Sequence, residues 1–396
     1  MEPMPWQRTD PMDQRTQFAL EALNCDNFRG LCRRYGISAK TGYKWRERLL
    51  RYGVGGLAEE SRRPQSHPDA LDEATVCAIV RLKHRHRAWG PRKLRDIYLR
   101  THGGQGPSES SFKRVLDKAG LVDKRRVRRP APTGRLCSGR QAQSPNEVWS
   151  IDFKGWWHDA AGQRCEPLTV RDEYSRYVLE SYRVADARTQ TVWERLETLF
   201  ERHGLPQAIR SDNGPPFASS RGLLGLSRLS SRWVALGIDL ERSRPGCPQD
   251  NGAHERLHRD MSQQLQKVHG GWSQEALDVW REEFNHERPH EALGMKRPAE
   301  IYRTSERRYG GLPEELDYGG MIVRKVKQTG HLVWQQQPIF LSSALGGWNV
   351  GLQPRHDGLL DVYFAQLLLG QLEPSTVSFI RGASASNEAD KPTMNP

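Results

Sequence analysis

Three acidic side chains, Asp152, Asp212 and Glu255, stand in sequence contexts that could bring them to one site. Asp152 lies within an expected strand (VWSIDF), Asp212 ends a second (QAIRSD), and Glu255 comes early in a helix expected from about Pro248. Strand ends and a helix start can converge on one rim of a sheet. Carboxylate oxygens suit Mg²⁺ or Mn²⁺, which leave positions open for phosphate and water. Two such ions about 4 Å apart can activate an attacking oxygen and stabilise a leaving one, so the pattern predicts metal-dependent phosphoryl transfer.

The residues beside these acids have simpler interpretations. Arg256 and Arg259, on the same helix as the glutamate, either contact phosphate or belong to a solvated helix face. Asn213 is expected to shape the turn that presents the second aspartate. Asp172 and Glu173 precede an expected strand turn, where turn chemistry explains them.

The segments that must position the acids show an α/β order from residue 146 on. EVWSIDFKGWW indicates a first strand, and CEPLTVRDEYSRYVLESYRV indicates two antiparallel strands around a turn. A helix over 188–203, the short strand of QAIRSDNG and further helices follow. This order predicts a mixed sheet. The stretch SSRGLLGLSRLSSRW, between the second aspartate and the glutamate, is expected to be a surface loop.

The charge of the chain is distributed unevenly. The net charge is +12, but residues 1–150 hold 30 Lys and Arg against 16 Asp and Glu, so the excess lies entirely in this part. A basic end joined to a nearly neutral body is typical of nucleic-acid binding, although a merely soluble basic surface is the alternative. The six cysteines form no zinc pattern or disulfide framework, which favours a reducing cytoplasm. No apolar run approaches the ~18 residues of a membrane span.

The first 60 residues predict a helix-turn-helix. Three helices are expected over 13–52, with Gly36 at a tight turn and Ser38 capping the third helix. That third helix would enter the major groove and expose Ser38, Lys40, Tyr43 and Lys44 to DNA. An ordinary small helical bundle with a cationic face is the alternative.

A second helical unit is expected at about 72–122, with Pro91 in the first turn of one helix and Ser108 opening another. The segment 124–145 that follows lacks apolar periodicity and carries seven Arg and Lys. A charge run between a DNA-reading unit and an α/β unit is expected to track phosphates. The residues concerned are Arg125, Arg126, Arg128 and Arg129.

The C-terminal part changes pattern again. Residues 320–372 alternate apolar and polar side chains around turns such as Gln328–Thr329–Gly330, which predicts a small β-barrel. The strand pattern alone leaves open a stabilising appendage or a binding module. Residues 382–396 have the composition of a disordered tail.

Four sequence segments carry a resemblance to a known family. VWSIDF, IRSDNGPPF, PGCPQDNGAHERLHR and FNHERPHEALGMKRPAEIY, in this order over about 146–302, resemble the integrase core of the DDE transposase and retroviral-integrase superfamily. RRYGISAKTGYKWRERL resembles the N-terminal part of bacterial insertion-sequence transposases. One departure is the 42 residues between the second aspartate and the glutamate, where such families commonly have about 35.

The resemblance implies a fold, an activity and a domain plan. It implies a multi-domain α/β protein with a ribonuclease-H-like core, in which Asp152, Asp212 and Glu255 are catalytic and bind two Mg²⁺ (or Mn²⁺) ions. Water would free a 3′-OH at an element end, and that 3′-OH would attack target DNA. The expected parts are a helix-turn-helix domain (1–60), a second such domain (70–123), a basic linker (124–145), the core (146–305), the barrel (318–375) and the tail (382–396).

Two rival functions stay open. A nuclease of the same fold would hydrolyse DNA without joining it, and an inactive transposase derivative would act only as a DNA-binding regulator. Retention of all three carboxylates speaks against the second. The expected partners are double-stranded DNA and further copies of the chain, with no membrane, in the bacterial cytoplasm at the nucleoid.

Overall fold

The computed structural model describes residues 10–59, 70–122, 139–158, 162, 164–184, 186–244, 251–265 and 272–382. The chain divides into two compact units, residues 1–71 and 72–396. The four arginines predicted to track phosphates in the linker lie outside the described residues, as does the predicted tail from residue 383 on.

The first unit contains the three predicted helices, α1 (Pro11–Glu21), α2 (Phe28–Arg34) and α3 (Ala39–Tyr52), followed by the short η1 (Val54–Leu57). Gly36 has a φ of 66°, as the predicted tight turn requires. Gly42 on α3 permits close packing, because a Cβ there would lie 2.6 Å from Cys32 Sγ and 2.9 Å from the Phe18 ring. The buried residues of this unit form a core of their own.

The second unit begins with the other predicted helical module, α4 (Glu73–Arg85), α5 (Pro91–Thr101) and α6 (Glu109–Lys118). Its α4 and α5 contact the following domain through charged side chains. Arg85 pairs with Glu287 at 3.4 Å, and Arg100 pairs with Glu300 at 2.9 Å. Much of the positive charge of α4 and α5 is therefore engaged within the chain.

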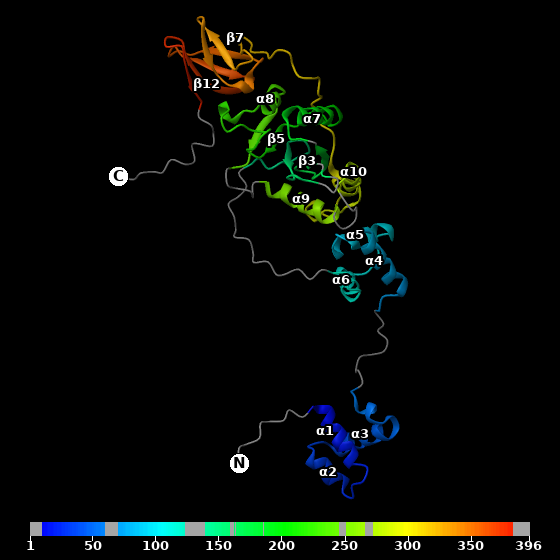
Figure 1. Cartoon of the computed structure of the whole chain (residues 1–396). Helices are drawn as coiled ribbons and strands as arrows, with labels where there is room; N and C mark the ends of the chain where they lie inside the picture. Colours follow the sequence, from blue (N-terminus) through cyan, green and yellow to red (C-terminus); the bar gives the residue numbers. More distant parts are fainter. Residues whose placement is uncertain are drawn as a thin grey trace, which may run out of the picture. The chain divides into compact units, whose positions relative to one another are not determined.

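A mixed sheet forms the centre of the second unit (Figure 1). Its strands run in the order β2-β3-β1-β5-β6, with β4 paired to β3. β1 is antiparallel to β3 and parallel to β5, and β5 is parallel to β6. The bounds are β1 (Val148–Phe153), β2 (Trp157–His158), β3 (Arg164–Asp172), β4 (Val178–Val184), β5 (Ala208–Ser211) and β6 (Asp239–Arg242). The predicted three strands correspond to β1, β3 and β4, followed as predicted by a helix and another strand, and the structure adds the two-residue β2.

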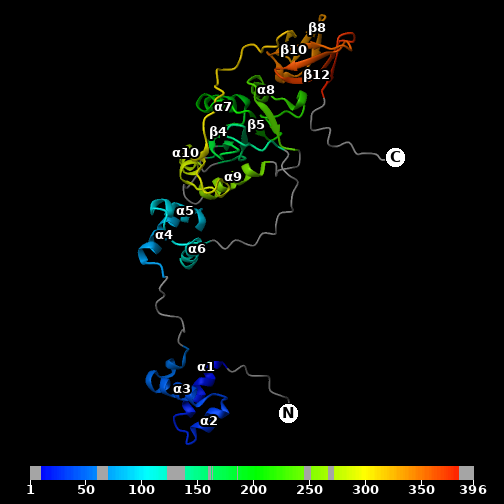
Figure 2. The same ribbon diagram turned by 180° about the vertical axis from the view of Figure 1, so that it is seen from behind.

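Helices cover both faces of this sheet (Figures 1 and 2). On one face α7 (Thr189–His203) and α8 (Arg228–Ala235) enclose the main core, with Trp149, Phe200 and Trp233 among its buried members. On the other face lie α9 (Gly252–Gln264) and α10 (Gln274–Glu282). Shorter elements complete the domain: η2 (Leu223–Gly225), η5 (Glu283–Glu287), η6 (Glu291–Leu293) and α11 (Pro298–Ile301).

The stretch SSRGLLGLSRLSSRW is not the surface loop that the sequence suggested. It forms η2 and most of α8, and it buries Leu223, Leu226, Leu229 and Trp233 to 3% exposure or less. Leu229 and Trp233, four residues apart on α8, share a helix face and pack into the main core, whereas Leu223 and Leu226 join the buried cluster of the C-terminal sheet.

The predicted C-terminal barrel is wrong in its closure. β7 (Ile322–Lys325), β10 (Asn349–Pro354), β11 (Leu360–Phe364), β12 (Leu367–Glu373) and β13 (Ser378–Arg381) form an open antiparallel sheet in the order β13-β12-β11-β10-β7. β8 (His331–Trp334) and β9 (Gln337–Phe340) form a separate hairpin, and η7 (Ser343–Leu345) follows it. Alternating residues predict strands with an inner face, but they do not say whether the edge strands pair.

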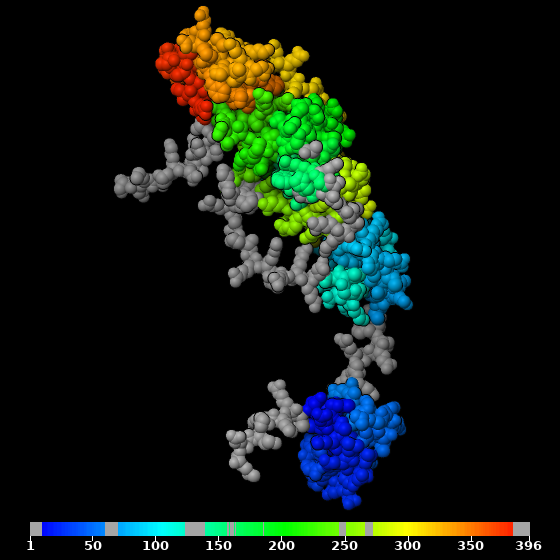
Figure 3. All heavy atoms as spheres, in the orientation of Figure 1, coloured from blue at the N-terminus to red at the C-terminus, as the bar shows by residue number. Residues whose placement is uncertain are grey.

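The C-terminal sheet packs against the mixed-sheet domain. Leu223, Leu226 and Ala235 belong to the same buried cluster as the inner residues of this sheet. Ser231 Oγ on α8 donates to the backbone oxygen of Ala344 at 3.0 Å. The space-filling view shows the orange C-terminal residues directly against the green ones (Figure 3).

Candidate active site

The two aspartates lie at one edge of the central sheet. Asp152 is the fifth residue of β1, and Asp212 directly follows β5. Because β1 and β5 are parallel neighbours, with Ser150 opposite Arg210, their carboxyl ends reach the same edge. Asp152 is half-buried and Asp212 is exposed. The backbone N–H of Gly214 donates to Asp212 Oδ1 at 3.2 Å, which orients that carboxylate.

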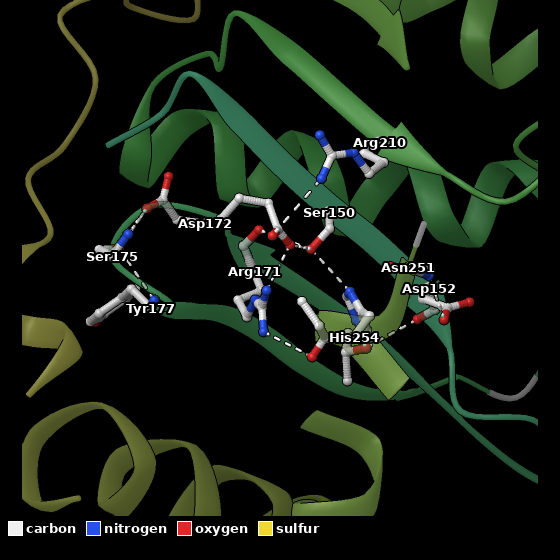
Figure 4. Close-up of polar contacts among 12 residues, drawn as sticks. Ser150, Asp152, Arg171, Asp172, Ser175, Tyr177, Arg210, Asn251 and His254 are labelled. Carbon is white, nitrogen blue, oxygen red and sulfur yellow. Dashed lines mark hydrogen bonds and ion pairs between the residues drawn. The ribbon is translucent and has the colours of Figure 1, made fainter. Parts of the chain in front are cut away.

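Glu255 reaches this edge from α9. It lies in the first turn of the helix and is exposed. The residue just before the helix, Asn251, donates from Nδ2 to Asp152 Oδ2 at 3.0 Å, so the start of α9 is joined to β1 (Figure 4).

The three acids share one electrostatic environment. The pKa of Asp152 is raised to about 7, first by burial and then by the negative charge of Asp212, with a smaller contribution from Glu255. Hydrogen bonds from the Phe153 backbone and from Asn251 oppose the rise. Asp152 therefore carries a charge that burial and its two acidic neighbours both disfavour.

No metal site is preformed in the part of the chain that the structure describes. Among those residues, no three Asp, Glu, His or Cys side chains converge on a position that could hold an ion. The exposed side chains of Asp212 and Glu255 do not close around Asp152 in this conformation.

The turns around the acids are partly as predicted. Asn213 donates from Nδ2 to the backbone oxygen of Ser243 at 2.6 Å, which fixes the turn after β5. Asp172 accepts from the backbone N–H and hydroxyl of Ser175 at 2.7 and 2.6 Å, so its turn role is confirmed. Glu173 also lies in this turn, as predicted, but turn chemistry does not account for its side chain. Its carboxylate accepts hydrogen bonds from Ser150 and from Arg171, at 2.5 and 2.8 Å.

Sequence reasoning missed the residues that hold α9 on the sheet. His254 and His258 face inward, and the Nε2 atoms of both lie within hydrogen-bond distance of Thr169 Oγ1, at 2.6 and 2.8 Å. Burial, followed by His258 and Arg171, lowers the pKa of His254 well below its usual value, so it is neutral. The available signal was their spacing: four residues apart, they alternate with Leu257 and Met261 on the inner face of the helix.

The predicted DNA-contacting residues are placed on exposed surfaces. Ser38, Lys40, Tyr43 and Lys44 are all exposed around the start of α3. The Ser38 hydroxyl accepts from the Thr41 backbone N–H at 3.2 Å and so serves as the predicted helix cap. Tyr43 stacks on Phe28 with ring centroids 4.3 Å apart, leaving 50% of the residue exposed.

The two arginines predicted near the glutamate, Arg256 and Arg259, are exposed on α9. Nothing in the described part of the second unit covers them.

Among the described helices, none has the length and apolar character of a membrane span.

Comparison with known families agrees with this architecture. Residues 142–248 and 236–298 match two integrase core domain families, and residues 41–116 match a homeodomain-like domain. The chain therefore contains an integrase core and is similar to bacterial insertion-element proteins. The predicted integrase core and helix-turn-helix region are thus confirmed. The homeodomain-like match runs from α3 through α6 and so crosses the boundary between the two compact units.

Proteins similar to this chain come from bacteria and retroviruses. It is 28% identical to the insertion element IS407 uncharacterized 31.7 kDa protein of Burkholderia multivorans, over 62% of this chain and 87% of that one. It is 29% identical to the insertion element IS476 uncharacterized 39.2 kDa protein of Xanthomonas euvesicatoria, over 64% of this chain and 72% of the relative. It is 31% identical to the Pol polyprotein of feline endogenous virus ECE1, over 48% of this chain and 16% of the polyprotein. A simian T-cell lymphotropic virus intasome chain, solved with PP2A regulatory subunit B56 gamma, matches at 18% identity and a TM-score of 0.36, over 73% and 97%.

Proposed function

We propose that this insertion-element protein is a DDE-type transposase that binds element ends, cuts DNA and joins the freed 3′-OH to a target. The observation that supports this most directly is the environment of Asp152. Two further acids, from the end of β5 and the start of α9, act on its carboxyl group electrostatically. Family membership supports DNA transposition in general, and the acids supply the specific chemistry.

The three carboxylates fit a divalent cation by charge. Burial and two acidic neighbours disfavour a charged Asp152, and a cation would reverse that penalty. The exposed side chains of Asp212 and Glu255 would have to turn toward Asp152, because they do not converge on an ion position as described. Mg²⁺ or Mn²⁺, as two ions, would supply charge neutralisation and polarise the scissile phosphate.

DNA is held by other parts of the chain in this proposal. The exposed face of α3, with Lys40 and Lys44, contacts the element end, and Arg256 and Arg259 contact phosphates beside the acids. The protein acts on double-stranded DNA at the bacterial nucleoid, as a homo-oligomer on paired ends.

The test removes one carboxylate charge at a time. Asp152→Asn, Asp212→Asn and Glu255→Gln should each reduce Mg²⁺-dependent cleavage of a duplex carrying the element end by at least ~10³-fold, with end binding nearly unchanged. Glu201→Gln, an exposed acid on α7, is the matched control. Near-wild-type cleavage by any of the three variants would remove that residue from the site.

The same assay separates the rival functions. A labelled 3′-OH donor incubated with target DNA gives a joined product only if the protein transfers strands. Cleavage without joining would indicate a nuclease, and binding without cleavage would indicate a regulator.

A further inference from the structure

A buried polar row crosses the catalytic sheet two residues behind the aspartates. Ser150 on β1 lies opposite Arg171 on β3 and Arg210 on β5, and Arg210 lies opposite Glu241 on β6. Side chains two residues apart on a strand share a face, so Ser150 points to the same side as Asp152. Ser150, Arg171 and Arg210 are only 1%, 3% and 9% exposed (Figure 4).

Glu173 balances the charge at the centre of this row. It accepts from Ser150 Oγ at 2.5 Å and from Arg171 Nη2 at 2.8 Å, and Arg210 Nη1 lies 4.0 Å from its second oxygen. Arg210 also pairs with Glu241 at 2.7 Å. Although burial raises the pKa of Glu173, Arg171 and the Ser150 hydroxyl outweigh it and the net shift is downward. Two guanidinium groups thus face two carboxylates, and the carboxylate of Glu173 is a fixed acceptor.

His254 of α9 joins this row to the residue opposite Asp152. It is fully buried, with Nδ1 3.0 Å from Ser150 Oγ and Nε2 2.6 Å from Thr169 Oγ1. Thr169 is the register partner of Asp152, and its hydroxyl also lies 3.2 Å from the backbone oxygen of Asp152. The immediate neighbour of His254 along α9 is Glu255.

Counting protons gives these contacts a direction. Ser150 has one hydroxyl proton and donates it to Glu173, so His254 Nδ1–H must donate to Ser150. A neutral His254 then has an acceptor at Nε2, to which the Thr169 hydroxyl donates. His258 Nε2–H donates in turn to Thr169. Ser150, His254 and Thr169 each donate one proton and accept one in the chain His258–Thr169–His254–Ser150–Glu173, and Thr169 shares its proton between His254 Nε2 and the backbone oxygen of Asp152.

We infer that this chain of hydrogen bonds is a positioning device that sets Glu255 relative to Asp152. It rests on the proposed role of the acids as metal ligands. Side chains that orient metal ligands typically change metal affinity 10- to 100-fold when removed. None of these residues touches the reacting atoms in this proposal. They act through the placement of α9 on β1 and β3.

The test measures metal binding without DNA. Mn²⁺ is titrated into the full-length protein, and free Mn²⁺ is followed by electron paramagnetic resonance. Thr169→Val keeps the side-chain shape and removes the hydroxyl, and should weaken Mn²⁺ binding about 10-fold. Thr169→Ser keeps the hydroxyl and should bind within about 2-fold of the wild type. Ser150→Ala removes only the hydroxyl group and should weaken Mn²⁺ binding as much as Thr169→Val does.

Two controls make the outcome decisive. Ser231→Ala removes another buried hydroxyl, whose partners are the backbone oxygens of Arg228 and Ala344, and should leave Mn²⁺ affinity unchanged. Asp152→Asn should abolish binding. The positioning role is refuted if Asp152→Asn loses Mn²⁺ binding while Thr169→Val and Ser150→Ala keep it. It is also refuted if Ser231→Ala or Thr169→Ser loses as much Mn²⁺ affinity as Thr169→Val. If Asp152→Asn itself binds like the wild type, the proposed metal site is what fails.

Discussion

Asp152 combines burial, like-charge neighbours and a strand position, and its charge has a consequence for stability. Its pKa of about 7 in the folded chain lies above the ordinary 3.8. Because the folded chain binds this proton more tightly than the unfolded chain, the protonated carboxyl group contributes its full stability at pH values below 3.8. That contribution to the free energy of unfolding is lost as pH rises through about 7. Without metal, the ionised carboxylate therefore weakens the folded state most above pH 7.

Replacement of this carboxyl group should relieve that weakness. Asp152→Asn should raise the melting temperature of the metal-free protein at pH 8 by several degrees and raise it less at pH 5, because an amide carries no charge at either pH. Differential scanning calorimetry in chelator measures both values. Asp212→Asn is the comparison and should gain less, since Asp212 is exposed. An equal gain at both pH values would contradict the assigned shift.

At the scale of single elements, α3 carries the proposed contact with element ends. Lys40→Ala and Lys44→Ala should each weaken end binding and lower the salt dependence by about one counterion. Fluorescence anisotropy at several salt concentrations measures both. Arg51→Ala at the far end of α3, where Arg51 pairs with Glu47 at 3.3 Å, is the matched control. If Arg51→Ala weakens binding as much as the lysine variants, the N-terminal end of α3 is not the contact face.

The contact of α5 with the catalytic domain gives a second prediction at this scale. Arg100 donates to Asp96, to Glu300 and to the Met295 backbone oxygen, at 2.7, 2.9 and 3.0 Å. Arg100→Ala should speed hydrogen exchange in α5 and around residues 295–301. Lys118→Ala, exposed at the end of α6, should not. Unchanged exchange in both variants would mean that Arg100 does not hold the module on the domain.

At the scale of the whole molecule, each chain carries one set of acids and a separate N-terminal unit. Two element ends must be cut and joined, so we expect at least a dimer, with one subunit able to bind the end that another cuts. A Glu255→Gln chain mixed with a chain carrying Lys40→Ala and Lys44→Ala should then recover cleavage that neither shows alone. Native gel shifts must show that mixed complexes form. Mixed complexes that stay inactive would mean that each subunit cuts the end it binds.

The sequence by itself determined the local features of this protein. The helices around Ser38 and Ser108, the turn at Gly36 and the strands that carry the aspartates follow from caps, glycine φ and apolar spacing. These signals act between residues near in sequence, so they survive without tertiary information. The choice of Asp152, Asp212 and Glu255 also came from short motifs, and it stays a prediction until the variants are measured.

Only the tertiary structure decided what depends on contacts between distant residues. The sequence indicated only a turn role for Glu173, because the residues near it in the sequence do not indicate that Arg210 and Ser150 are its partners. The leucines of η2 and α8 were predicted to lie in a surface loop because the core that buries them comes partly from the C-terminal sheet, which is distant in sequence. Barrel closure was overpredicted for a related reason. Strand alternation reports which side chains face inward, whereas pairing of edge strands depends on how the whole sheet twists and what packs beside it.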